Sequence, residues 1–152
     1  MAKLASFTIR VYGLLFNDKQ EVLVSDEWIE QKLYTKFPGG GLELGESTKA
    51  AVIREFMEET EQHIEVVSHF YTTDFLIRST FYPSKQVICI YYIVKLSQKF
   101  TLTTVSHANY GRTEGPNEIL GFRWVPLSKL TSEAVSFESD KRVVGLLQQS
   151  AI

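Results

Sequence analysis

The sequence predicts a single α/β domain in which strands and helices are mixed along the chain. Segments rich in β-branched and aromatic residues recur throughout the 152 residues, and such segments are typical of strands. Residues 47–60 and 138–149 have the amphipathic pattern of helices. No repeat, low-complexity segment or linker divides the chain, and its length suits one domain spanning residues 1–152.

The first expected elements are two strands joined by a turn. Residues 7–16 are mostly β-branched or aromatic, and Asn17-Asp18-Lys19 is a turn signal, so residues 21–25 are expected to form the returning strand. The segment at 38–41 is one proline followed by three glycines, and we expect a loop without regular structure there.

Further strands are expected on both sides of a polar loop. Residues 63–82 are predicted to form one long strand or two strands with a bend, and the nearly all-apolar residues 86–96 a central buried strand. The segment 103–116 is polar and contains glycine and proline, which predicts a surface loop. The remaining predicted elements are a strand at 119–125 and helices at 128–136 and 138–149.

Composition and charge exclude several classes of protein. Hydrophobic residues make up 44% and charged residues 22% of the chain, which excludes a disordered or collagen-like protein. The net charge of −2 provides no broad attraction to nucleic acid or to a membrane surface, so neither is expected as a partner. The single cysteine, Cys89, excludes an internal disulfide, and no apolar run reaches the roughly 18 residues of a membrane span. We expect a cytoplasmic monomer or homodimer that acts on a small molecule.

The helix expected at 47–60 gathers carboxylates on one side. At about 100° per residue, Glu55, Glu58 and Glu59 fall within an arc of roughly 100°. Like charges at this spacing repel by about 0.2–0.5 kcal/mol per pair, whereas clustered carboxylate oxygens suit a divalent cation such as Mg²⁺ or Mn²⁺. The alternative is an ordinary solvated helix face. Gln62 is expected to extend the polar side, and the side expected to be buried consists of Ala50, Ile53, Phe56, Met57 and Thr60.

A glycine-rich segment precedes this helix. Glycines at positions 39, 40, 41 and 45 allow close backbone approach and positive φ angles. A backbone carbonyl from this segment can therefore point at a metal ion held by the helix. Alone such a segment indicates only a turn, but its fixed spacing from the three glutamates strengthens the prediction of a metal site.

Together these two elements resemble the Nudix box, Gly-x5-Glu-x7-Arg-Glu-apolar-x-Glu-Glu-x-Gly-apolar. The positions that match are Gly40, Glu46, Arg54, Glu55, Phe56, Glu58 and Glu59. The sequence departs from the box at its end, where Glu61 and Gln62 replace the glycine and the apolar residue. Because that glycine normally takes the left-handed conformation that ends a helix, the departure concerns the helix terminus and not the metal ligands.

The resemblance implies a Nudix-type α/β/α sandwich with a mixed β-sheet. It also implies a metal-dependent hydrolase that cleaves the phosphoanhydride bond of a nucleoside diphosphate linked to another group, such as a nucleoside triphosphate or a nucleotide sugar. In this reading, Glu55 and Glu59 bind Mg²⁺ or Mn²⁺ with help from the carbonyl of Gly39. Glu58 binds metal or helps to activate water, and Arg54 orients the glutamates by pairing with a carboxylate.

Further residues are candidates for the site by the same resemblance or, in the case of Arg112, because long loops in compact domains are often functional. Glu46 contributes to the carboxylate network or simply interacts favourably with the positive end of the helix. Many family members use another glutamate from a late loop, and here the candidates are Glu118, which we prefer, and Glu114. Arg112, in the loop expected at 103–116, is predicted to lie beside the active site and meet a substrate phosphate; its alternative role is an exposed loop residue.

Two other functions remain alternatives. A catalytically inactive Nudix-fold module could sense or bind a nucleotide, although all the box glutamates are present. An isoprenoid-diphosphate isomerase-like member would use a cysteine, but Cys89 lies in an apolar strand, as a core thiol does. The histidines have no metal-ligand spacing.

Overall fold

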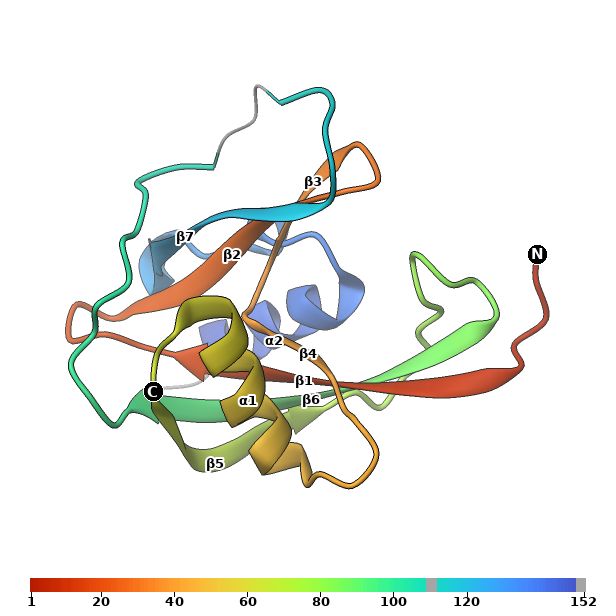
Figure 1. Cartoon of the computed structure of the whole chain (residues 1–152), viewed down its shortest axis with the longest axis horizontal. Coiled ribbons are helices and arrows are strands. Elements are labelled where there is room, and N and C mark those ends of the chain that lie inside the picture. The colour runs from red at the N-terminus through yellow and green to blue at the C-terminus, as the bar shows by residue number, and fades with distance from the viewer. Residues whose placement is uncertain (109–111, 150–152) are drawn as a thin grey trace. The chain divides into compact units, whose positions relative to one another are not determined.

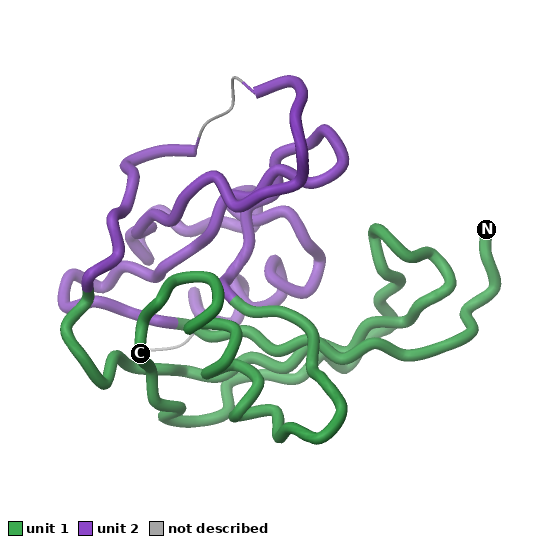
Figure 2. The backbone as a smooth tube through the Cα atoms, in the orientation of Figure 1, with its two compact units in different colours: residues 1–14, 39–100 green, residues 15–38, 101–152 purple. Residues whose placement is uncertain are grey.

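The computed structural model describes residues 1–108 and 112–149. The chain forms two compact units, each built from two separate segments: unit 1 comprises residues 1–14 and 39–100, and unit 2 comprises residues 15–38 and 101–152 (Figure 2). Three residues of the loop expected at 103–116, Asn109, Tyr110 and Gly111, lie outside the described residues. No helix in the described part of the chain is long and apolar enough to cross a membrane.

Unit 1 is a four-stranded sheet with one helix on it. The strand order is β4-β1-β6-β5, and the helix α1 lies across one face (Figure 1). The bounds are β1 Ser6–Leu15, β4 Gly39–Gly41, α1 Thr48–Thr60, β5 Ile64–Thr72 and β6 Lys85–Leu96. The strand predicted at 86–96 is therefore an interior strand, and the predicted α/β class with a mixed sheet is confirmed.

The glycine segment at 39–41 is a short strand and not the loop expected from the sequence. It pairs antiparallel with β1, placing Gly41 opposite Arg10, Gly40 opposite Val11 and Gly39 opposite Tyr12. Glycine disfavours a strand because it has no side chain to pack. Here β4 is at the edge of its sheet, and the missing side chains leave room for α1.

Helix α1 begins where the sequence predicts it. The hydroxyl of the N-cap residue Ser47 accepts a hydrogen bond from the Ala50 amide at 3.0 Å, which satisfies one of the unpaired donors of the first turn. The helix packs on the face of β1 that carries Gly13, where the Phe56 ring fills the space that a Cβ would occupy. At the same face, the Thr48 and Tyr92 hydroxyls are hydrogen-bonded at 2.6 Å.

The buried side of α1 is rotated from the predicted one. Buried residues are Ala51, Val52, Phe56 and Thr60. The expectation that Ala50 and Ile53 are buried was wrong, since Ala50 is exposed and Ile53 is 40% exposed. The rotation follows from the contact with β4: turning the helix in this direction brings Glu55 against a glycine strand that offers no side chain to collide with it.

Helix α1 ends in the left-handed conformation without a glycine. Glu61 has φ 58° and ψ 22°, and its amide donates to the Met57 carbonyl at 3.0 Å. Gln62 was expected to extend the polar face, but it is buried, with 3% exposed. The backbone amide of Gln62 donates to the Thr60 hydroxyl at 3.2 Å, and its side-chain Nε2 donates to the Thr60 carbonyl at 3.1 Å. The box therefore keeps its usual backbone turn with unusual residues.

Replacing Glu61 with glycine is expected to stabilise the protein. A residue with a Cβ loses about 1–2 kcal/mol in the left-handed region, and glycine returns part of this as unfolded-chain entropy, so Glu61→Gly should raise the free energy of unfolding by about 1 kcal/mol. Urea denaturation measures it. The matched control is Glu61→Ala, which removes the charge but keeps the Cβ and should gain less. A loss of stability in Glu61→Gly would contradict the backbone explanation.

Unit 2 is a three-stranded antiparallel sheet, in the order β3-β2-β7, followed by helices. The bounds are β2 Glu21–Ile29, β3 Lys32–Lys36, β7 Glu118–Pro126, η1 Leu127–Lys129, η2 Ser132–Ala134 and α2 Glu138–Gln149. The strand predicted at 119–125 and the helix at 138–149 are present. The strand predicted at 21–25 is longer than expected and continues through a hairpin into β3, which the sequence analysis did not predict.

The prediction of a helix at 128–136 was wrong, because the segment forms two short 3₁₀ helices. Leu130 and Val135 have extended backbone conformations after each of them. The ammonium group of Lys141, from α2, donates to the carbonyls of Ser132 at 2.6 Å and Val135 at 2.7 Å. Hydrogen bonds to a side chain thus replace the ones that a continuous helix would have made.

A buried ion pair joins the strands of unit 2. The Arg123 guanidinium on β7 donates to both carboxylate oxygens of Asp26 on β2, at 2.7 and 3.0 Å. The Thr35 hydroxyl on β3 donates to the same carboxylate at 2.6 Å. Asp26 is 1% exposed, and a buried carboxylate is tolerated only when it is paired in this way. The contacts therefore fix the three strands to one another.

Candidate active site

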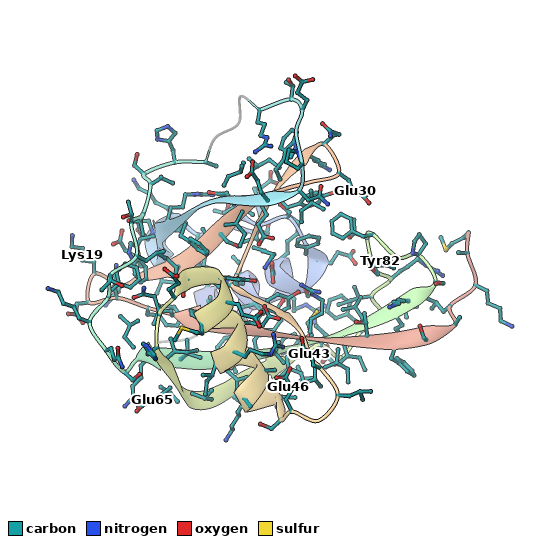
Figure 3. The ribbon with its side chains drawn as sticks, viewed as in Figure 1. Lys19, Glu30, Glu43, Glu46, Glu65 and Tyr82 are labelled. Carbon is teal, nitrogen blue, oxygen red and sulfur yellow. The ribbon has the colours of Figure 1, made fainter. Side chains whose placement is uncertain are left out.

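Unit 1 brings together six of the predicted site residues, which lie in β4, just before α1 and along the second half of α1. They are Gly39, Glu46, Arg54, Glu55, Glu58 and Glu59. Glu46 lies just before α1, and Figure 3 shows it and Glu43 beside the start of that helix. Each of the four glutamates among the six reaches a neighbour in the box or its glycine strand through the contacts described next.

Arg54 is the centre of these contacts. Its Nε and Nη2 donate to the two oxygens of Glu46 at 2.9 and 2.7 Å, a bidentate pair. Its Nη1 donates to Glu55 at 3.0 Å and to Glu58 at 3.2 Å, while Nη2 also donates to the Gly41 carbonyl at 3.0 Å. The carboxylates raise the pKa of Arg54, with the hydrogen bond to Glu46 as the main cause. One guanidinium therefore holds three carboxylates and the glycine strand together.

Glu46 is held in its charged form by two kinds of donor. Its hydrogen bonds with Arg54 are the main cause that lowers its pKa to about 2, and the Glu43 amide, which donates to Glu46 at 2.9 Å, adds to the shift. The side chain is 16% exposed. Two interactions were predicted for Glu46, with the carboxylate network and with the positive end of the helix. The contacts show that its main partner is Arg54.

Glu55 and Glu59 lie one helical turn apart, and both rest against β4. The Glu55 carboxylate is so close to Gly40 that a Cβ there would lie 2.4 Å from its Cδ. The Gly39 amide donates to Glu59 at 3.4 Å. The glycine strand thus forms a cradle for two carboxylates beside the residue whose carbonyl is the predicted third ligand.

These residues fit a magnesium ion better than a metal that needs a complete protein cage. Within residues 1–108 and 112–149, no three histidine, cysteine, aspartate or glutamate side chains are grouped closely enough to hold a metal ion. Mg²⁺ commonly uses one or two carboxylates and takes its other ligands from water and substrate phosphates. Glu55 and Glu59 match that requirement, whereas the Glu58 side chain is 56% exposed, against 13% for Glu55.

The other two predicted site residues, Arg112 and Glu118, belong to unit 2 and form an ion pair with each other. Arg112 also donates to the Glu114 carbonyl at 2.9 Å and lies over the Trp28 ring, 5.4 Å from its centroid. Glu118 begins β7, opposite Trp28 on β2. Their predicted roles as phosphate ligand and base stay predictions.

Sequence reasoning missed one partner of the site, on β4, and one charged residue on the neighbouring strand β1. The Gly41 carbonyl, which accepts from Arg54, has no signal of its own in a sequence. Arg10 did have one, because it is the single charged residue in the predicted strand at 7–16. Cys89, the residue of the isomerase alternative, is 2% exposed in β6.

Comparison with known proteins matches this architecture to one family. The NUDIX domain family matches residues 6–145. The MutT protein of Methanosarcina mazei Go1 is 21% identical, with a TM-score of 0.70 over 98% of this chain and 96% of that one. An ADP-ribose pyrophosphatase of Streptococcus suis is 15% identical, with a TM-score of 0.58 over 95% and 94%. A UDP-X diphosphatase is 18% identical, with a TM-score of 0.62 over 97% and 66%.

No curated protein matches the chain in sequence. At these identities the solved structures establish the fold alone. The domain match covers nearly the whole chain, so the chain belongs to the Nudix family and is a Nudix hydrolase.

The Glu46–Arg54 pair is expected to make stability depend on pH in acid. The folded-state pKa of about 2 lies below the ordinary 4.5, so the Glu46 carboxylate stabilises the fold fully above the ordinary pKa. That contribution is lost as the pH falls from 4.5 toward 2. Unfolding free energies of wild type and Glu46→Gln, measured across this range, should differ most at neutral pH and converge in acid. A difference that does not change with pH would contradict the assignment.

Proposed function

We propose that this Nudix hydrolase cleaves a phosphoanhydride bond in a nucleoside diphosphate linked to another group, with Mg²⁺ or Mn²⁺ held by Glu55 and Glu59. The observation that carries the proposal is the contact of both carboxylates with β4. Two structural neighbours, an ADP-ribose pyrophosphatase and a UDP-X diphosphatase, support the substrate class. The domain match runs through both units, which supports a single domain over residues 1–152.

The proposed division of labour follows from the contacts of the box. A bound cation would neutralise phosphate charge and lower the pKa of attacking water. Glu55 and Glu59 would hold it with the Gly39 carbonyl. Glu58, the most exposed of the three glutamates, is free to accept a proton from water when it leaves Arg54. Arg54 positions the carboxylates through its four partners.

The substrate is found by testing purified protein against a panel. Nucleoside triphosphates, dinucleoside polyphosphates, ADP-ribose, NADH and nucleotide sugars cover the class, each with Mg²⁺ and with Mn²⁺. Tight nucleotide binding without turnover of any compound would favour a sensing module in place of the hydrolase. Full turnover in excess chelator would contradict the metal site.

Removing a proposed metal ligand is expected to damage rate and leave the fold intact. Glu59→Gln should lower kcat at least about tenfold, which is roughly 1.4 kcal/mol of barrier. Without metal, its melting temperature should be unchanged or slightly higher, because one repelling charge is gone. Initial rates with metal and thermal melting without it measure both. The control is Glu65→Gln, on β5 and paired with Lys95, which should alter neither. Normal kcat in Glu59→Gln together with a lower melting temperature would instead indicate a solvated structural carboxylate.

Arg112 is proposed to bind a substrate phosphate. Arg112→Ala should then raise KM and leave kcat nearly unchanged, the pattern of lost uniform binding. A second variant tests its ion-pair partner, Glu118. If Glu118 is the base, Glu118→Gln should lower kcat. Lys19→Ala, in the exposed turn of the same unit, is the control. A KM within about twofold of wild type would mean that Arg112 only braces its loop.

A further inference from the structure

Arg10 is a charged residue on an interior strand of unit 1. Side chains alternate between the two faces of a strand. Gly13 faces α1, where it meets Phe56, so Arg10 and Tyr12 lie on the opposite face of β1. Arg10 is partly buried. Burying the Arg10 guanidinium takes a charged group out of water, which costs free energy. The contacts of Arg10 offset only part of this cost.

Tyr12 fixes the Arg10 guanidinium. Arg10 Nε donates to the Tyr12 hydroxyl at 2.7 Å, and its Cζ lies 5.7 Å from the centre of the Tyr12 ring. Tyr12 is itself stacked on Tyr91 of β6, with ring centres 5.1 Å apart. The Arg10 side chain is thus hydrogen-bonded through one nitrogen, Nε. Within the described residues, its Nη1 and Nη2 have no hydrogen-bond partner and no carboxylate within ion-pair distance.

The register of the sheet places Arg10 beside the strand that contacts a proposed metal ligand, Glu55. Arg10 is opposite Gly41 in the sheet, next to Gly40, against which the Glu55 carboxylate rests. Tyr12 is the main cause that raises the pKa of Arg10, and Glu55 adds to the shift. The negative charge of Glu55 therefore favours the charged form of Arg10, although the two side chains do not form an ion pair.

We propose that Arg10 binds a phosphate oxygen of the substrate's diphosphate through Nη1 and Nη2. The proposal rests on the proposed function, because it requires a diphosphate bridged to a cation at Glu55 and Glu59. The planar guanidinium fork matches two phosphate oxygens. Holding Nε on Tyr12 orders the fork before substrate arrives, which reduces the entropy lost on binding. The assignment adds a substrate-binding residue outside the Nudix box.

A purely structural Arg10 predicts a different behaviour. If its task were to offset the negative charge of Glu55, its removal would mainly change metal affinity, raising it because a repelling cation is gone. If it binds phosphate, its removal lowers affinity for a diphosphate and leaves metal binding intact or stronger. Metal affinity and diphosphate affinity, measured separately, distinguish the two.

The experiment uses methylene diphosphonate, which cannot be hydrolysed and carries no base or sugar. Calorimetry with Mg²⁺ gives its affinity, and titration with Mn²⁺ followed by electron paramagnetic resonance gives metal affinity. Arg10→Met should lose at least tenfold in diphosphonate affinity and keep its Mn²⁺ affinity. Arg10→Lys, which keeps the charge but not the fork, should lose less, and it remains informative if Arg10→Met does not fold.

The matched control is Lys85→Met. Lys85, on β6 of the same unit, is also a cation over a tyrosine ring, 5.3 Å from the centre of Tyr82, but Tyr82 is 64% exposed and the pair has no contact with the box. Its removal should leave diphosphonate affinity unchanged. A loss of less than twofold in folded Arg10→Met or Arg10→Lys overturns the assignment while leaving the proposed function intact. Failure of wild type to bind Mn²⁺ contradicts the proposed function and the assignment together.

Discussion

The close approach of α1 to the glycine strand β4 is the constraint on which the candidate site depends. A Cβ at position 40 would lie 2.4 Å from the Glu55 Cδ, and a Cβ at position 39 would lie 2.0 Å from the Val11 carbonyl oxygen. At position 39 the clash is with the backbone of β1, whereas at position 40 it is with the end of the Glu55 side chain. A side chain at position 40 would therefore displace the Glu55 carboxylate from β4, and one at position 39 would force β4 and β1 apart.

Charge explains why the proposed site would favour a cation. Arg54 is bonded to three carboxylates at once, so a single positive charge offsets three negative ones. The remaining negative charge lies on the carboxylates of the box. Glu59, which accepts a hydrogen bond from the Gly39 amide, adds to this negative charge. A divalent ion is the partner that removes such a surplus with hard oxygen ligands. The arginine thus orders the carboxylates without neutralising them.

The sequence was sufficient for the features that depend on spacing and insufficient for those that depend on packing. The bounds of α1 and α2 follow from capping and periodicity, and the box follows from fixed intervals. The hairpin from β2 to β3 was missed because its turn is Glu30-Gln31, both with positive φ, where a two-residue turn usually has asparagine or glycine. The rotation of α1 was missed because periodicity cannot register the space left by a glycine strand that pairs with β1.

The end of α1 shows which part of the Nudix box is conformational and which is chemical. Glu61 takes the left-handed conformation that glycine usually supplies, and Gln62 is buried where an apolar side chain is usual, with its amide satisfied by the Thr60 carbonyl. The chain turn is therefore imposed by the surrounding fold and not by the residue that occupies it. Glu59 is positioned separately, by the Gly39 amide. Because the carboxylates are held by β4 and Arg54, the helix terminus can change its residues without moving them.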